Sequence, residues 1–96
     1  MKALTDIRQI LTSQKSYLTQ RYKVARLAVF GSYSRGEQTP QSDVDILVEF
    51  NGPIGLEFVD LAFELEDKLG EKVDLVSKGG VKPAYLKAIE SELVYV

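Results

Sequence analysis

The sequence predicts a small α/β fold of the α+β type, with helices packed on a mixed β-sheet of three to four strands. The chain has 96 residues, a length that suggests a single domain over residues 1–96. Short apolar runs that end at glycine or at polar turns alternate with longer segments whose apolar residues recur at helical spacing. The segments follow in the order helix, strand, loop, strand, helix, strand, helix, which indicates a layer of helices on a sheet.

The first half of the chain predicts one helix, two strands and a loop between the strands. Residues 4–20 place apolar side chains near a 3.6-residue period, which is typical of an amphipathic helix, and Thr5 is the expected N-cap. The apolar run 24–30 ends at a glycine and predicts a strand. Residues 31–41 contain glycine, proline and polar side chains, so we expect a loop with a short helix near its start. The run 43–50 predicts the second strand.

The second half predicts the clearest helix and a third strand. Residues 56–69 present a broad apolar face and are followed by Gly70, a typical residue just beyond a helix. Residues 72–76 predict a strand, which leads into a Lys-Gly-Gly turn. A proline in the first turn favours a helix over 83–92. Residues 93–96 are apolar and form either a final short strand or an apolar tail.

Composition excludes several kinds of site. The chain has no cysteine and no histidine, so disulfides, the common zinc sites and histidine acid–base catalysis cannot be built. A metal ion would need oxygen ligands, which favours Mg²⁺, Mn²⁺ or Ca²⁺. The net charge is −2 and basic residues do not cluster, which argues against direct nucleic-acid binding. No stretch suits a membrane span or a signal peptide, so a cytoplasmic protein is expected.

A Gly-Ser pair between the first two predicted strands suits a phosphate group. Gly31 allows a tight turn and a close approach of the backbone to a ligand. Ser32 supplies a hydroxyl and, at the start of a helix, a backbone N–H that can face an anion. The simpler interpretation is a strand-to-helix turn capped by Ser32. Arg35 either binds a phosphate oxygen or pairs with a nearby carboxylate, that of Glu37 or Asp43.

Two aspartates open the second predicted strand and a third lies in the next strand. Asp43 and Asp45 share one face because side chains alternate along a strand. Asp74 is expected to face away from the core, so the three carboxylates converge if their strands are neighbours. Such a cluster is typical of one or two Mg²⁺ ions, although aspartate at a strand end is also a common turn former. Ser42 either caps the backbone of Asp43, which we favour, or contacts the metal ligands.

The spacing of these residues resembles a known signature. Gly31-Ser32, ten intervening residues and Asp43-x-Asp45 are similar to the motif of the polymerase-β-like nucleotidyltransferase superfamily. The residues Tyr33-Ser34-Arg35-Gly36, the short length and the Val-Asp-Leu-Val run around Asp74 resemble its smallest branch, the minimal nucleotidyltransferases (MNT). The resemblance covers nearly the whole chain and implies the polymerase-β-like nucleotidyltransferase fold in a single minimal domain over residues 1–96.

The resemblance also implies roles for these residues. Asp43 and Asp45 would hold two Mg²⁺ ions, with Mn²⁺ as a substitute, and Asp74 would complete one ion's ligands and help to deprotonate an acceptor hydroxyl. Gly31 and Ser32, with Arg35 and Ser42 beside them, would hold the triphosphate. The reaction would move NMP, most often AMP from ATP, to a hydroxyl and release pyrophosphate. MNT proteins are commonly antitoxins paired with a helical HEPN toxin, which they are thought to neutralise by AMPylation of a tyrosine.

Three functions are therefore in competition. The first is a protein-modifying nucleotidyltransferase that acts as the antitoxin of a HEPN toxin. The second is an antitoxin that blocks its partner sterically with little or no catalysis, for which the apolar residues 93–96 would offer a partner surface. The third is a small-molecule, antibiotic-type nucleotidyltransferase whose acceptor pocket forms across an oligomer.

Overall fold

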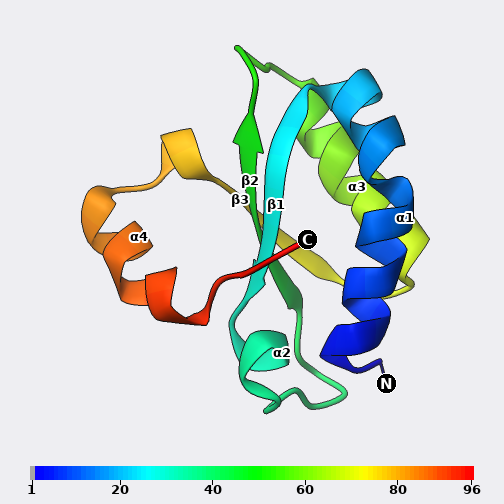
Figure 1. Ribbon diagram of the computed structural model, residues 1–96, viewed down its shortest axis with the longest axis vertical. Helices are drawn as coiled ribbons and strands as arrows, with labels where there is room; N and C mark the ends of the chain where they lie inside the picture. Colours follow the sequence, from blue (N-terminus) through cyan, green and yellow to red (C-terminus); the bar gives the residue numbers. More distant parts are fainter. Residues whose placement is uncertain (1) are drawn as a thin grey trace.

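Residues 2–96 are described by a computed structural model, in which four strands form one mixed sheet with helices on both faces (Figure 1). The strand order is β3-β2-β1-β4, so β3 and β4 are the edges. β1 runs antiparallel to β2 and β4, whereas β2 and β3 are parallel. The elements are α1 (Leu4–Tyr22), β1 (Val24–Phe30), α2 (Ser32–Arg35), β2 (Val44–Phe50), α3 (Glu57–Leu69), β3 (Val73–Ser77), the 3₁₀ turn η1 (Lys78–Gly80), α4 (Pro83–Ile89), the 3₁₀ turn η2 (Glu90–Glu92) and β4 (Val94–Tyr95).

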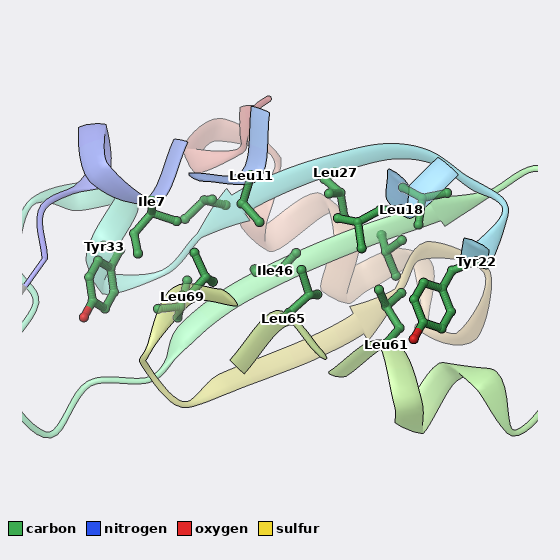
Figure 2. Close-up of a cluster of buried hydrophobic side chains, with 14 residues drawn as sticks. Ile7, Leu11, Leu18, Tyr22, Leu27, Tyr33, Ile46, Leu61, Leu65 and Leu69 are labelled. Atoms are coloured by element: carbon green, nitrogen blue, oxygen red, sulfur yellow. The ribbon is translucent and has the colours of Figure 1, made fainter. Parts of the chain in front are cut away.

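The larger core lies between the sheet and the helices α1 and α3. Both helices lie on the same side of the sheet in Figure 1 and turn apolar stripes toward it. Figure 2 shows these side chains meeting those of β1 and β2, with two tyrosines closing the ends of the cluster. Burial of this apolar surface is the main stabilising contribution. The fully buried side chains include Ile7, Leu11, Leu18, Leu27, Ile46, Leu61, Leu65 and Leu69.

A smaller core on the other face of the sheet is covered by α4. Ala28, Phe30 and Leu47 point to this side, because they alternate with the residues of the larger core. Ile89 of α4 completes the buried set, and Leu86 and Leu93 pack against it. In Figure 1, α4 stands on the opposite side of the sheet from α1 and α3. The second apolar face of the sheet is therefore closed by the last third of the chain.

The predicted elements are confirmed with shifts at their ends. The helix predicted over 4–20 continues to Tyr22, and its N-cap is Ala3 rather than Thr5. Thr5 was the wrong cap because the Asp6 carboxylate accepts a hydrogen bond from the Ala3 amide at 2.9 Å and begins the helix earlier. Strand β2 begins at Val44, one residue later than predicted. The predicted end of α3 is confirmed, since Gly70 adopts the left-handed conformation with φ 67°.

The C-terminal elements differ more from the prediction. α4 ends at Ile89 and the chain continues as the 3₁₀ turn η2, so the helix predicted over 83–92 is shorter than expected. Of the two alternatives for 93–96, the short strand is the one formed. Val94 and Tyr95 pair with β1, and the Val96 amide donates to the Leu27 carbonyl. These residues belong to the edge of the sheet, where the Tyr95 side chain stays partly exposed.

Within residues 2–96, no helix is both long enough and apolar enough to cross a membrane. The longest helix, α1, carries charged and polar side chains along its exposed side.

Candidate active site

Three neighbouring strands bring the candidate site together at one end of the sheet. Asp45 of β2 lies opposite Asp74 of β3 in the parallel register, and opposite Phe30 of β1 in the antiparallel register. Asp74, Asp45 and Phe30 thus form a row across the sheet, and Gly31 follows directly after Phe30. Asp45 alternates with Ile46 of the larger core, so its side chain lies on the face that α4 covers. The structure thus places Asp45 and Asp74 on neighbouring strands, as the sequence predicted.

The Asp45 carboxyl lies in an environment that disfavours its charge. Burial, together with the negative charges of Asp74 and Asp43, raises the pKa of Asp45 from 3.8 to about 6. Glu92 adds to the rise, whereas Arg35 opposes it. Clusters of like charges are common in sites that bind cations or transfer protons. A cation between these side chains would relieve the repulsion.

Asp43 lies just before the strand that carries Asp45. Because β2 begins at Val44, Asp43 lies outside the strand and its side chain is exposed. Among residues 2–96, no three acidic side chains are already gathered closely enough to hold a metal ion. The convergence that the sequence predicts for three carboxylates is therefore present for Asp45 and Asp74, with Asp43 at the edge of the strand. Oxygen ligands of this kind suit Mg²⁺, so the donor set fits the ion that the sequence implies.

Gly31 is required by the close approach of its backbone to Asp45. Its φ of +75° is a conformation that L side chains rarely adopt, and a Cβ atom built there would lie 1.9 Å from Oδ2 of Asp45. The next residue, Ser32, begins the four-residue helix α2. The loop that was predicted to hold phosphate is therefore in direct contact, at Gly31, with the candidate metal ligand Asp45.

Arg35 pairs with carboxylates, one of the two alternatives that the sequence left open. Its Nε atom lies 2.8 Å from Oε1 of Glu37, as the sequence suggested. Its Nη1 atom lies 3.1 Å from Oε2 of Glu92, a partner far along the chain that the sequence did not suggest. These contacts raise the pKa of Arg35. The guanidinium stays at the mouth of the site, with its side chain 46% exposed.

Ser42 has a different contact from the one that we favoured. Its hydroxyl accepts a hydrogen bond from the Thr39 amide at 2.9 Å, and its own amide donates to the Thr39 carbonyl at 2.9 Å. Ser42 closes the 39–42 turn rather than capping the backbone of Asp43, because the chain folds back at Pro40. The turn, together with Asp43, Glu71 and Lys72, lines a cavity of about 330 Å³ beside the carboxylates.

Two residues of the site escaped the sequence reasoning. Tyr85 of α4 is 41% exposed, and its ring meets Phe30 edge-on at 6.3 Å. Burial, and to a smaller extent the negative charges of Asp74, Asp45 and Glu92, raise the pKa of Tyr85. Glu92 of η2 accepts a hydrogen bond from the Gly31 amide at 2.8 Å. The sequence predicted the helix that carries these residues, but no local motif indicated which face of the sheet it covers.

Comparison with known proteins identifies the family. Residues 11–96 match the family described as "Nucleotidyltransferase domain". The chain belongs to this family. It is a nucleotidyltransferase, so it acts on a nucleotide substrate. The loop and the paired aspartates described above lie within the matched range.

Relatives of this chain match it over its full length. A Methanocaldococcus jannaschii protein, named provisionally as a protein adenylyltransferase, is 51% identical over 98 residues, which cover 100% of both chains. The protein adenylyltransferase MntA of Thermococcus cleftensis is 46% identical over 97 residues, which cover 100% of this chain and 98% of the relative.

Solved structures share the fold. A provisionally named minimal nucleotidyltransferase superimposes with a TM-score of 0.81 and 35% identity, over 97% of this chain and 95% of that one. A chain in a toxin-antitoxin crystal structure with AMP-PNP superimposes with a TM-score of 0.71 and 25% identity, over 96% of this chain and 70% of that one. The minimal nucleotidyltransferase fold expected from the sequence is thereby confirmed.

Proposed function

We propose that this chain, as one domain acting in the cytoplasm, is a Mg²⁺-dependent protein adenylyltransferase and the antitoxin of a helical HEPN-type toxin. It transfers AMP from ATP to a tyrosine hydroxyl of that partner. The observation that carries the proposal is the placement of Asp45 and Asp74 on adjacent strands against the Gly31 loop. The relatives named as protein adenylyltransferases match this chain over its full length, which supports a protein acceptor.

The donor atoms of the chain suit a bound nucleotide and its metal ions. Asp43, Asp45 and Asp74 offer the carboxylate oxygens that would hold Mg²⁺, which would supply charge neutralisation at the phosphates. The backbone at Gly31 and Ser32, with the Arg35 guanidinium nearby, would bind the triphosphate. Ser42 supports this arrangement through the 39–42 turn next to Asp43.

The chemistry that follows is an in-line displacement at the α-phosphorus. The acceptor oxygen forms a bond to that phosphorus while the bond to the bridging oxygen of the β-phosphate breaks. The leaving pyrophosphate carries away the electron pair of the broken bond. Asp74 lies beside Asp45 on the exposed edge strand, where it accepts the hydroxyl proton of an incoming acceptor.

Label transfer tests the proposal directly. The chain is incubated with ATP labelled at the α-phosphate, Mg²⁺ and the HEPN-type partner, and label on the partner is measured. We expect transfer by the wild type, and at least a 100-fold loss in Asp45→Asn and in Asp43→Asn. Asp60→Asn is the matched control, because Asp60 is an exposed aspartate of α3 outside the site. Transfer at the wild-type rate by Asp45→Asn would contradict the assignment.

One observation favours the steric alternative instead. Leu56 lies just before α3, and Val59 and Phe63 lie within it. Their exposed fractions are 87% for Leu56, 50% for Val59 and 65% for Phe63. These apolar side chains follow a helical spacing of three and four residues, so they form a stripe that a partner would cover. If the antitoxin acts only sterically, the Asp45→Asn variant should still neutralise the toxin, and the Phe63→Asp variant should not. A catalytic antitoxin shows loss of neutralisation in Asp45→Asn.

A further inference from the structure

Glu92 of η2 reaches back to the loop that follows β1. One oxygen of its carboxylate, Oε1, lies 2.8 Å from the Gly31 amide and 3.2 Å from Nη1 of Arg35. The other oxygen, Oε2, lies 3.1 Å from the same Nη1 atom. The Ser34 hydroxyl donates to the Glu92 backbone carbonyl. One residue near the C-terminal end of the sequence therefore contacts three residues of the loop.

The groups that Glu92 engages are donors suited to an anion. A backbone N–H and a guanidinium are the groups that bind carboxylate and phosphate oxygens alike. Under the proposed function, both Gly31 and Arg35 face the triphosphate. The Gly31 amide has a single hydrogen, which cannot be shared at full strength between Glu92 and a phosphate oxygen. Only 21% of the Glu92 side chain is exposed, so the carboxylate is held in place rather than free in solvent.

We propose that Glu92 sets the nucleotide affinity of this chain by occupying phosphate-binding donors of the loop, and that a nucleoside triphosphate binds by displacing its carboxylate. The inference rests on the proposed function, because it assigns Gly31 and Arg35 to the triphosphate. Displacement also loosens η2, which leads directly into β4. Nucleotide binding is then coupled to the position of residues 90–95.

A role in positioning makes the opposite prediction. If Glu92 served to hold Arg35 and the loop in the geometry that ATP needs, its removal would weaken nucleotide binding. If Glu92 competes with phosphate, its removal strengthens binding. The direction of the change in affinity therefore separates the two roles.

The experiment is a calorimetric titration of the full chain with AMP-PNP in the presence of Mg²⁺. We expect Glu92→Gln to bind about tenfold more tightly than the wild type, since a charge-assisted contact no longer has to be broken. Glu90→Gln is the matched control, because it removes the same charge from the same 3₁₀ turn at an exposed position. We expect Glu90→Gln to bind within about twofold of the wild type.

The possible results separate competition by Glu92 from the alternatives. Equal or weaker binding by Glu92→Gln, while the wild type binds AMP-PNP, overturns the competition and leaves the proposed function intact. An equal gain in both variants also overturns it, because general charge then explains the effect. If neither the wild type nor the variants bind AMP-PNP, the proposed function fails and the competition fails with it.

A second measurement needs no variant, should Glu92→Gln fold poorly. Amide hydrogen exchange of the wild type is followed with and without AMP-PNP and Mg²⁺. We expect the Val94 and Val96 amides, which face β1 in the ladder, to exchange faster in the presence of nucleotide, because η2 is released. Slower exchange or no change at these amides, with AMP-PNP bound, would overturn the displacement.

Discussion

The Gly31 backbone and the Asp45 carboxylate are in such close contact that no side chain fits between them. A Cβ atom at Gly31 would lie 1.9 Å from Oδ2 of Asp45 and 2.9 Å from its Cγ. The contact joins the end of β1 to the start of β2 and sets how near the loop comes to the candidate metal ligand. It makes glycine a requirement of the site and not merely of the turn.

Gly31→Ala is therefore expected to damage both stability and activity. The substitution adds a clash with Asp45 to an unfavourable φ of +75°, so the free energy of unfolding should fall by about 2 kcal/mol or more. Displacement of Asp45 should lower label transfer about 100-fold. Urea unfolding and the transfer assay measure the two effects.

Gly36→Ala is the control for the backbone effect alone. Gly36 has a φ of +71°, and a Cβ atom there would meet no atom within 4 Å. We expect a loss of about 1 kcal/mol in stability with transfer nearly unchanged. Equal effects of the two substitutions on transfer would contradict the role given to the Gly31–Asp45 contact.

Asp45→Asn is expected to stabilise the metal-free protein at neutral pH. An acid whose pKa rises on folding, here from 3.8 to about 6, binds its proton more tightly in the folded state. Its unfavourable effect on stability is complete above about pH 6 and disappears as the pH falls toward about 4. The carboxyl is partly exposed, so we expect a discounted gain of about 1 kcal/mol at pH 7.5, or roughly 4–8 °C in Tm.

The pH series identifies the cause of that gain. The advantage of Asp45→Asn over the wild type should shrink below pH 6 and vanish near pH 4 in thermal unfolding with a chelator present. Asp60→Asn, which removes an exposed carboxylate of α3, should give no gain. A constant advantage at every pH would show that burial of the Asp45 charge is not responsible.

Mg²⁺ is expected to stabilise the wild type through the same carboxylates. A ligand that binds the folded state alone raises stability by about 1.4 kcal/mol at ten times its dissociation constant. Thermal unfolding with increasing Mg²⁺ should show this rise in the wild type and a much smaller one in Asp45→Asn and Asp74→Asn. The same rise in all three proteins would place the ion elsewhere.

Much of the fold was predictable because its elements are set by local patterns. The strand Val24–Phe30 and the glycine that ends α3 follow from apolar runs and from the left-handed residue that a helix end favours. The adjacency of Asp45 and Asp74 was conditional on strand pairing, which no local pattern specifies. The structure supplies that pairing. Asp43 was predicted in the strand, but it lies just before it because the ladder begins at Val44.

The contribution of α4 and η2 could not be predicted from spacing. Tyr85 contacts Phe30 at the end of β1, and Glu92 contacts the Gly31 amide, because the last helix packs on the second face of the sheet. Leu86 and Ile89 make that packing. That face is chosen by the whole packing arrangement, so a scan for motifs near Gly31 and Asp43 does not reach it. Ser42 shows the converse, since its position next to Asp43 suggested a role that the 39–42 turn takes instead.

Tyr85 offers a test of this part of the site. Its ring packs edge-on against Phe30, and the charges of Asp74 and Asp45 contribute to the raised pKa of its hydroxyl. Tyr85→Ala should lower stability by about 1 kcal/mol, because the ring is partly buried, and should raise the KM for ATP several-fold. Tyr85→Phe should keep most of both properties. A loss as large in Tyr85→Phe as in Tyr85→Ala would show that the hydroxyl, not the ring, carries the role.

The position of β3 at the edge of the sheet has a consequence for how the site can come apart. β3 is held by β2 on one side only, and its residues are partly or fully exposed. Fraying of this strand would carry Asp74 away, while Asp45 would stay in place because β2 remains paired with β1. The two carboxylates therefore differ in how firmly they are held: Asp45 belongs to a central strand of the sheet, and Asp74 belongs to an edge strand. An ion that bridges Asp45 and Asp74 would hold the edge strand β3 to the rest of the sheet.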